Sequence, residues 1–183
     1  MRAESPFRKP VHVLPDCYSV SVFSGSEEDI AGWKRIMMDP PSPPDGADSC
    51  YHLMIETYPD VVPEKDIFFI VSPSGEKVAS FTAVTHKDGS GYLHMVKARL
   101  SERGKGLGHV MAEKAVGEFS RRGCKTVILT TDDFRLPAIK TYLDAGFQPV
   151  IEDEEDKARW KKVIEDLDYP SGLDEIMYKE RDV

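Results

Sequence analysis

Cysteine is scarce in this sequence, and its three copies have no metal-binding spacing. Cys17, Cys50 and Cys124 form neither a C-x-x-C pair nor a cysteine–histidine pattern. An odd number of cysteines without such a pattern favours free thiols in a reducing compartment over a disulfide framework. We therefore expect no metal ion and a cytoplasmic location.

Long hydrophobic runs and an excess of basic residues are also missing. No stretch approaches the about 18 apolar residues of a membrane-spanning helix, and the start, MRAESPFRKP, lacks the apolar core of a secretion signal. Lysine and arginine number 24 against 32 acidic residues, which gives a net charge of −8. Nucleic acids and anionic membranes attract basic surfaces, so we expect neither as a partner. A cationic amine suits this charge better.

The remaining composition is that of a globular domain, with 40% hydrophobic and 31% charged residues in 183 positions. This length favours one domain over residues 1–183, ending in a helix and tail from about residue 152 to residue 183. The sequence leaves open whether that helix and tail close a site or mediate a homodimer.

Hydrophobic periodicity predicts an alternation of strands and helices. Alternating or continuous apolar runs predict strands at residues 17–23, 66–72, 77–87, 92–98, 126–131 and 147–151, with a further candidate at 174–179. Apolar stripes at helical spacing predict helices at residues 27–38, 49–58, 107–122, 137–145 and 152–167. Ser26 and Asp29 form a capping box for the first of these helices. The order predicts an α/β (α+β) fold with a mixed sheet, antiparallel early and with one parallel crossover.

The stretch LHMVKARLSERGKGLGHV, residues 93–110, places glycines and basic residues between a strand and a helix. Neither G-x-G-x-x-G nor the Walker pattern fits it, whereas R-x-x-G-x-G fits at Arg103, Gly106 and Gly108. Glycines allow close backbone approach, and free N–H groups at a helix start attract a diphosphate. Arg99 and other basic side chains add positive charge. A tight turn without a ligand is the alternative interpretation.

A second pattern follows thirty residues later, Ala138-Ile139-x-x-Tyr142-x-x-x-Gly146-Phe147. With the R-x-x-G-x-G pattern, at this separation and in this order of elements, it resembles the GNAT superfamily of acyl-CoA-dependent N-acyltransferases. The resemblance covers at least residues 91–150. It implies the GNAT fold, a mixed sheet of six to seven strands flanked by helices, and acetyl-CoA as co-substrate.

The resemblance also implies a role for each matching position. Backbone groups of Val96, Lys97 and Ala98 would pair with the pantetheine arm of the cofactor. The diphosphate would be held by the loop residues that begin the following helix, namely Arg103, Gly104, Lys105, Gly106, Leu107, Gly108 and His109. Arg135 stands where the family often has asparagine, and we include it among the cofactor-binding residues.

Tyr142 is the predicted catalytic acid. In the family, a tyrosine at this place protonates the departing thiolate, and general acid catalysis of this kind contributes roughly 10²–10⁴-fold. The alternative is a core aromatic residue that packs against Ile139 one helical turn away.

An amine acceptor must also lose a proton. The best candidate base is His94, in the predicted strand at residues 92–98, which corresponds to the fourth strand of the family. Strict alternation puts His94 on the same face as Val96 and Ala98. A structural histidine is the alternative role, and Asp132, Asp133, Glu56 or a chain of waters are alternative bases. Thr130 stands where some protein-acetylating members carry glutamate, which weakens the case for a protein substrate.

We therefore predict an N-acetyltransferase that acts on a primary amine, most simply of a small molecule, by direct attack on the thioester. The alternatives are a protein or peptide N-acetyltransferase, a non-catalytic acyl-CoA sensor, and a protein that binds another diphosphate nucleotide. The proline-rich loop at residues 39–48 and the helix at residues 49–58 fall where the family places the wall of the acceptor site. The polar and aromatic side chains of this helix either line a pocket or form a surface helix; they are Tyr51, His52, Glu56 and Tyr58.

Overall fold

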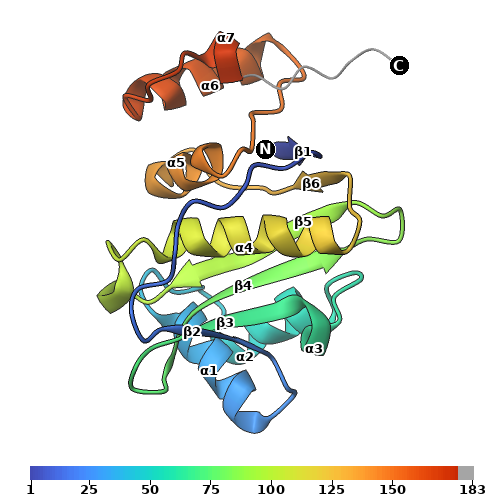
Figure 1. Ribbon diagram of the computed structural model, residues 1–183, viewed down its shortest axis with the longest axis vertical. Helices are drawn as coiled ribbons and strands as arrows, with labels where there is room; N and C mark the ends of the chain where they lie inside the picture. Colours follow the sequence, from blue (N-terminus) through green and yellow to red (C-terminus); the bar gives the residue numbers. More distant parts are fainter. Residues whose placement is uncertain (177–183) are drawn as a thin grey trace.

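The computed structural model describes residues 1–176 and contains one six-stranded mixed sheet in the order β1-β6-β5-β4-β3-β2 (Figure 1). Its strands are β1 (Arg2–Glu4), β2 (Ser19–Val22), β3 (Ile67–Val71), β4 (Lys77–Thr85), β5 (Gly91–Ala98) and β6 (Thr126–Ile128). The helices are α1 (Glu27–Met38), α2 (Gly46–Tyr51), α3 (Pro63–Asp66), α4 (Leu107–Arg121), α5 (Leu136–Asp144), α6 (Glu154–Asp166) and α7 (Leu173–Ile176). The predicted fold class is confirmed.

Strands β2 to β5 form an antiparallel meander, and α4 then returns the chain so that β6 runs parallel to β5. A parallel neighbour needs such a crossover, because a hairpin can only join antiparallel strands. The meander of β3, β4 and β5 was predicted from the turn residues, and the crossover from the continuous apolar run at β6. The pairing of β2 with β3 was not predicted.

Two buried clusters cover the two faces of the sheet. Met111, Ala115 and Phe119 of α4 pack on one face, together with Phe81 and Leu93 of the central strands. The other face carries α1 and α2, which bury Trp33, Ile36, Met37, Cys50 and Tyr51 against Ile67 and Phe69. A third cluster joins α6 to the outer side of α5 through Trp160, Val163 and Ile164. The predicted C-terminal helix therefore covers α5.

Local signals set the bounds of several elements. Helix α1 begins and ends where predicted, and the Ser26 hydroxyl accepts a hydrogen bond of 3.2 Å from the Asp29 N–H. The predicted helix at residues 49–58 begins earlier, at Gly46, and continues as a π-helical turn (His52–Glu56). Of the candidate strand at 174–179, residues up to 176 are helical and the rest lies outside the described residues.

The edge of the sheet beyond β6 differs from the prediction. Residues 147–151 were predicted as a strand, but this segment contains isolated bridge residues in place of a continuous strand, namely Gln148, which pairs with Arg2, and Val150. Strand β1, from the start of the chain, pairs antiparallel with β6 instead. Pro149 has no N–H to donate, which weakens its segment as a ladder partner. Three residues are too short for a periodic signal, so the sequence did not reveal β1.

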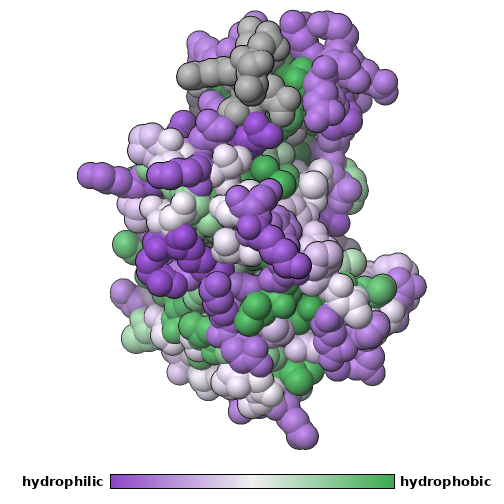
Figure 2. Space-filling view, turned by 90° about the vertical axis from the view of Figure 1, so that its right-hand side faces the viewer, coloured by the Kyte–Doolittle hydropathy of each residue, from purple (hydrophilic) through white to green (hydrophobic). Residues whose placement is uncertain are grey.

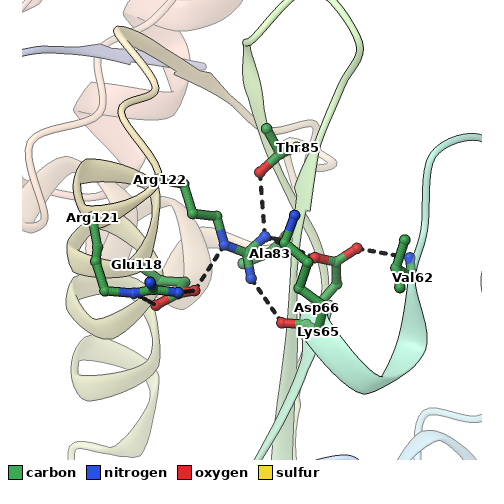
Figure 3. Close-up of polar contacts among 8 residues, drawn as sticks. All are labelled: Val62, Lys65, Asp66, Ala83, Thr85, Glu118, Arg121 and Arg122. Atoms are coloured by element: carbon green, nitrogen blue, oxygen red, sulfur yellow. Dashed lines mark hydrogen bonds and ion pairs between the residues drawn. The ribbon is translucent and has the colours of Figure 1, made fainter.

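A buried ion cluster joins the end of α4 to the sheet and to α3 (Figure 3). The Arg122 guanidinium lies 2.7 Å from the Asp66 carboxylate and 2.7 Å from Glu118, and it donates to the carbonyl oxygens of Ala83 and Lys65. The side chains of Arg122 and Asp66 are only 5% and 2% exposed. Because each charge is paired and hydrogen-bonded, the cluster escapes the penalty of an isolated buried ion.

The surface view of Figure 2 shows mostly hydrophilic residues in the upper part of the molecule and more hydrophobic surface in its lower half. Within residues 1–176, no helix combines the length and the apolar character needed to cross a membrane.

Candidate functional site

The glycine loop forms the sharp connection between β5 and α4. Gly104 and Gly106 have φ values of +79° and +76°, in the left-handed region that glycine adopts at little cost. A Cβ at either position would meet no other atom within 4 Å. Gly106 is also the N-cap of α4, so the free N–H groups of the first helical turn start here. The loop is open and has the geometry that an anion-binding turn requires.

Strands β5 and β6 separate beside this loop. Their parallel pairing is limited to Gly91 with Val127 and Tyr92 with Ile128. From Leu93 onward, β5 has no strand partner on this side among residues 1–176, although it remains paired with β4 as far as Ala98. The opened edge leaves backbone groups of the end of β5 beside a gap in the sheet.

A β-bulge in β5 changes which side chains share a face. Thr82 pairs with His94 and Ser80 with Lys97, so Phe81 alone lies opposite two residues, of which Met95 has φ +49°. The extra residue breaks the alternation of side chains.

The prediction that His94 shares a face with Val96 and Ala98 was therefore wrong. Val96 and Ala98 pack toward α4, whereas Met95 packs toward α1 on the other face. His94 contacts Met54 and Tyr58, which follow α2.

His94 is buried and holds a defined tautomer. Its Nε2 lies 3.1 Å from the carbonyl oxygen of Met54, and because a carbonyl only accepts, Nε2 carries the proton and Nδ1 keeps its lone pair. Burial lowers the pKa of His94, since desolvation disfavours the imidazolium. The ring is thus neutral near pH 7 and has a basic nitrogen.

Tyr142 projects from α5 into the core on the α4 face, where it is 8% exposed and contacts Phe147 edge-on at 6.0 Å between ring centroids. Its cluster includes Leu93 of β5 and Leu129 just after β6, the residues on either side of the separation. Burial raises the pKa of Tyr142 to about 12, so the phenol stays protonated. Because the Tyr142 hydroxyl keeps its proton, it is available as a proton donor at this place.

Three cationic side chains gather near the end of β5. Lys97 donates through Nζ to the carbonyl oxygens of Met37, Asp39 and Pro41, and burial lowers its pKa. The nearby charges of Arg103 and Arg135 lower the pKa of Lys97 further, as expected for positive groups close together.

A match to a family model decides what this site belongs to. The model described as the acetyltransferase (GNAT) family matches residues 26–147, which is more than half of the chain. The chain belongs to the acetyltransferase (GNAT) family. It is therefore an acyltransferase, and the predicted family is confirmed. The matched segment runs from the N-cap of α1 to the glycine-phenylalanine pair after α5.

Solved structures agree with this assignment at the level of the fold. A GCN5-related N-acetyltransferase from Sphaerobacter thermophilus aligns with 72% of this chain and 41% of its own, at 20% identity and a TM-score of 0.54. The ribosomal-protein-S18-alanine N-acetyltransferase from Escherichia coli aligns over 72% of this chain and 78% of its own length, at 17% identity and a TM-score of 0.59. A chain of the NatC complex bound to Gag peptide and CoA aligns over 69% of this chain and 82% of its own length, at 19% identity and a TM-score of 0.55.

These likenesses show the fold alone, and the chain spans less than half the length of the Sphaerobacter thermophilus protein. The sequence has no significant match among curated proteins.

Several of the residues predicted for this GNAT site make contacts within the protein. Lys105 pairs with Glu102 at 2.9 Å, and Arg103 donates to the Pro40 carbonyl oxygen at 3.2 Å. The His109 ring lies 3.0 Å from the Asp144 carboxylate. The remaining loop residues offer mainly backbone, as predicted, since two of them are positive-φ glycines and Leu107 is buried.

The alternative bases are already paired with neighbouring side chains. Asp132 pairs with Arg135 at 2.9 Å, Asp133 with Arg159 at 3.1 Å, and Glu56 with His52 at 2.9 Å. Of the side chains at residues 49–58, Tyr51 belongs to the core while His52 and Glu56 are exposed.

Tyr92 is the residue of this site that sequence reasoning missed. Its hydroxyl lies 2.8 Å from the Thr130 hydroxyl, across the separation of β5 and β6, and its ring stacks on Tyr58 with 6.1 Å between the ring centroids. Tyr58 in turn stacks on His94. Tyr92 lies two positions before His94 in the same strand, so the period of two was the signal that could have found it.

Proposed function

We propose that the protein transfers an acetyl group from acetyl-CoA to the primary amine of a small molecule. The separation of β5 from β6 after Tyr92 carries this proposal. The open glycine loop lies at one end of the separated strand, and the buried phenol of Tyr142 packs against residues of both strands. A thioester held in this gap would meet a proton donor.

The cofactor-binding part of the proposal rests on backbone and charge. The free edge of Val96, Lys97 and Ala98 would pair with the amide groups of pantetheine as a neighbouring strand does. The N–H groups from Gly104 to His109 would hold the diphosphate, and the charges of Arg103 and Arg135 favour an anion nearby. The NatC complex, whose structure was solved with CoA bound, supports this choice by fold alone.

Transfer follows by direct attack. The amine lone pair forms a bond to the thioester carbonyl carbon, and the bond from that carbon to sulfur breaks. The departing thiolate takes the proton of the Tyr142 hydroxyl, and the Nδ1 atom of His94 takes the proton that the amine nitrogen loses, directly or through water. An ammonium has no free lone pair, so the attack requires a neutral amine.

Two observations bear on the acceptor. Thr130, in the position of the glutamate in some protein-acetylating members, hydrogen-bonds to Tyr92, which supports a small amine. The alanine N-acetyltransferase among the structural neighbours favours a peptide N-terminus as the second candidate.

The test is thiol release from acetyl-CoA with pooled small primary amines and, separately, with peptides that have free N-termini. Release with small amines, reduced in Tyr142→Phe, supports the proposal. Release with peptides alone would favour the second candidate. Saturable CoA binding without release in any pool would reject transfer and favour an acyl-CoA sensor.

A further inference from the structure

A segment of the chain that the family pattern leaves unassigned lies against the glycine loop. This N-terminal arm, residues 5–18, runs past the N-terminal end of α4 (Figure 1). The Glu113 carboxylate of α4 accepts hydrogen bonds from the backbone N–H groups of Val11 and His12 at 3.1 and 2.9 Å. The His12 ring also stacks on His109, in the first turn of α4, at 4.4 Å between centroids. The arm is therefore fixed to the half of α4 that begins at the loop.

Tyr18 extends these contacts into the loop itself. Its hydroxyl donates to the Glu102 carboxylate at 2.7 Å and accepts from the Lys105 ammonium at 3.0 Å. Lys105 also donates to Glu102 at 2.9 Å, so the three groups form a closed triangle. The hydrogen bonds that the Lys105 ammonium donates to Tyr18 and Glu102 raise the pKa of Lys105, because they favour its charged form. Tyr18 thus holds the two charged residues that flank Arg103 and Gly104.

The loop needs contacts of this kind because it makes few of its own. Gly104 and Gly106 have the largest conformational freedom of any residue type in an unfolded chain, and open space surrounds both. Arg103 is fixed from one side through the Pro40 carbonyl oxygen. Tyr18 supplies a second contact, to Glu102, from a segment 84 residues away in the sequence.

We propose that Tyr18 is a positioning residue for cofactor binding, which keeps Lys105 and the glycine loop in the conformation that accepts a diphosphate. This inference rests on the proposed function, because the loop must receive that diphosphate. Preorganisation lowers the cost of ordering a loop at the moment of binding. The Tyr18 hydroxyl touches only Glu102 and Lys105 among the contacts described, so its effect on the cofactor is indirect.

The experiment is a calorimetric titration with coenzyme A of the wild type, Tyr18→Phe and Ser90→Ala. Ser90, in the turn before β5, is the control, since it is also half-buried and donates through its hydroxyl to a carboxylate, that of Asp88, at 2.7 Å. We expect the Kd for coenzyme A to rise about three- to tenfold in Tyr18→Phe, the scale of one ordinary hydrogen bond. The Kd of Ser90→Ala should match the wild type.

Pantetheine, which lacks the diphosphate, separates positioning from general damage to the protein. Its Kd should be the same for the wild type and Tyr18→Phe. In a Lys105→Met background, Tyr18→Phe should change the Kd for coenzyme A by less than about twofold, because the hydrogen bond between Tyr18 and Lys105 is already lost.

Equal affinity of Tyr18→Phe and the wild type for coenzyme A would overturn this inference and leave the proposed function standing. So would equal weakening of coenzyme A and pantetheine binding in Tyr18→Phe, or equal weakening of coenzyme A binding in the Ser90→Ala control. If the wild type shows no saturable binding of coenzyme A, the proposed function is rejected together with this inference.

Discussion

The imidazole of His94 stacks on the phenol ring of Tyr58, with 4.1 Å between the ring centroids. The stack shields the imidazole from water on one face, and the Met54 carbonyl oxygen occupies its Nε2. Burial favours the neutral imidazole and outweighs the hydrogen bond to the Met54 carbonyl oxygen, which by itself raises the pKa of His94. That hydrogen bond fixes the orientation of the ring. His94 lies in the regular part of the β4–β5 ladder, and the bulge that follows it at Met95 puts Val96 and Ala98 on the opposite face of the sheet.

The pH dependence of turnover should report this environment. Because burial lowers the pKa of His94 from 6.5, the neutral base is present above that value and is lost only in more acidic solution. The plot of log kcat against pH should therefore fall on the acid side, with a midpoint below about 6.5. In His94→Gln we expect a plateau about 10²-fold lower without that acid limb. An unchanged acid limb in the variant would remove His94 from the proton transfer.

Tyr142→Phe tests the proton donor. Loss of the hydroxyl should lower kcat about 10²-fold or more, and the Kd for coenzyme A should change by less than about twofold. Because the pKa of Tyr142 is raised to about 12, the phenol stays protonated across the usual assay range, and the wild type should show no loss of kcat from this group up to about pH 10. Steady-state kinetics measures kcat, and calorimetric titration measures the Kd for coenzyme A. Undiminished turnover in the variant would assign Tyr142 to packing only.

The buried ion cluster offers a test of the fold that is independent of function. Arg122→Met leaves the Asp66 carboxylate buried without its guanidinium partner, which should lower the free energy of unfolding by roughly 3–5 kcal/mol. Arg121 is the control, because it pairs with the same Glu118 but has a 71% exposed side chain. Arg121→Met should cost less than about 1 kcal/mol. Urea unfolding curves measure both, and equal losses would contradict the role of burial.

Glu118 links the same cluster to pH. The hydrogen bond from Arg121, followed by that from Arg122, lowers the pKa of Glu118 from 4.5 to about 2. A lowered pKa in the folded protein means that the ionised carboxylate stabilises it above pH 4.5 and that this stabilisation is lost as the pH falls toward 2. The difference in unfolding free energy between the wild type and Glu118→Gln should therefore be full at pH 7 and shrink below pH 4.5. A difference that does not change with pH would refute this linkage.

Local patterns predicted the elements that local interactions determine. The capping residue Ser26 and the glycine-rich start of α4 each act within a few residues, and helices α1 and α4 occur as expected. Strand β6 begins at the predicted Thr126 but ends at Ile128, three residues before the predicted end. The meander could be predicted because its turns contain residues that adopt turn conformations.

Features that depend on pairing between distant segments could not be predicted. The bulge at Met95 exists only relative to β4, and β1 is a strand only because β6 offers an edge. The contact of Tyr18 with Glu102 joins residues 84 positions apart. Neither residue has a local pattern that indicates the other, so the sequence revealed the loop but not what supports it.

Substitution at Gly106 tests the central claim most directly. In Gly106→Ala, the new methyl group would meet no protein atom but would stand where the diphosphate must approach. Gly75, in the β3–β4 turn, is the control, with φ +85° and equally open space, so both variants should lose a similar about 1–2 kcal/mol of stability from backbone strain.

The decisive measurement is the Kd for coenzyme A in these two variants and the wild type, by calorimetric titration. The account predicts at least about tenfold weaker binding in Gly106→Ala and unchanged binding in Gly75→Ala. The same affinity in all three proteins would contradict it.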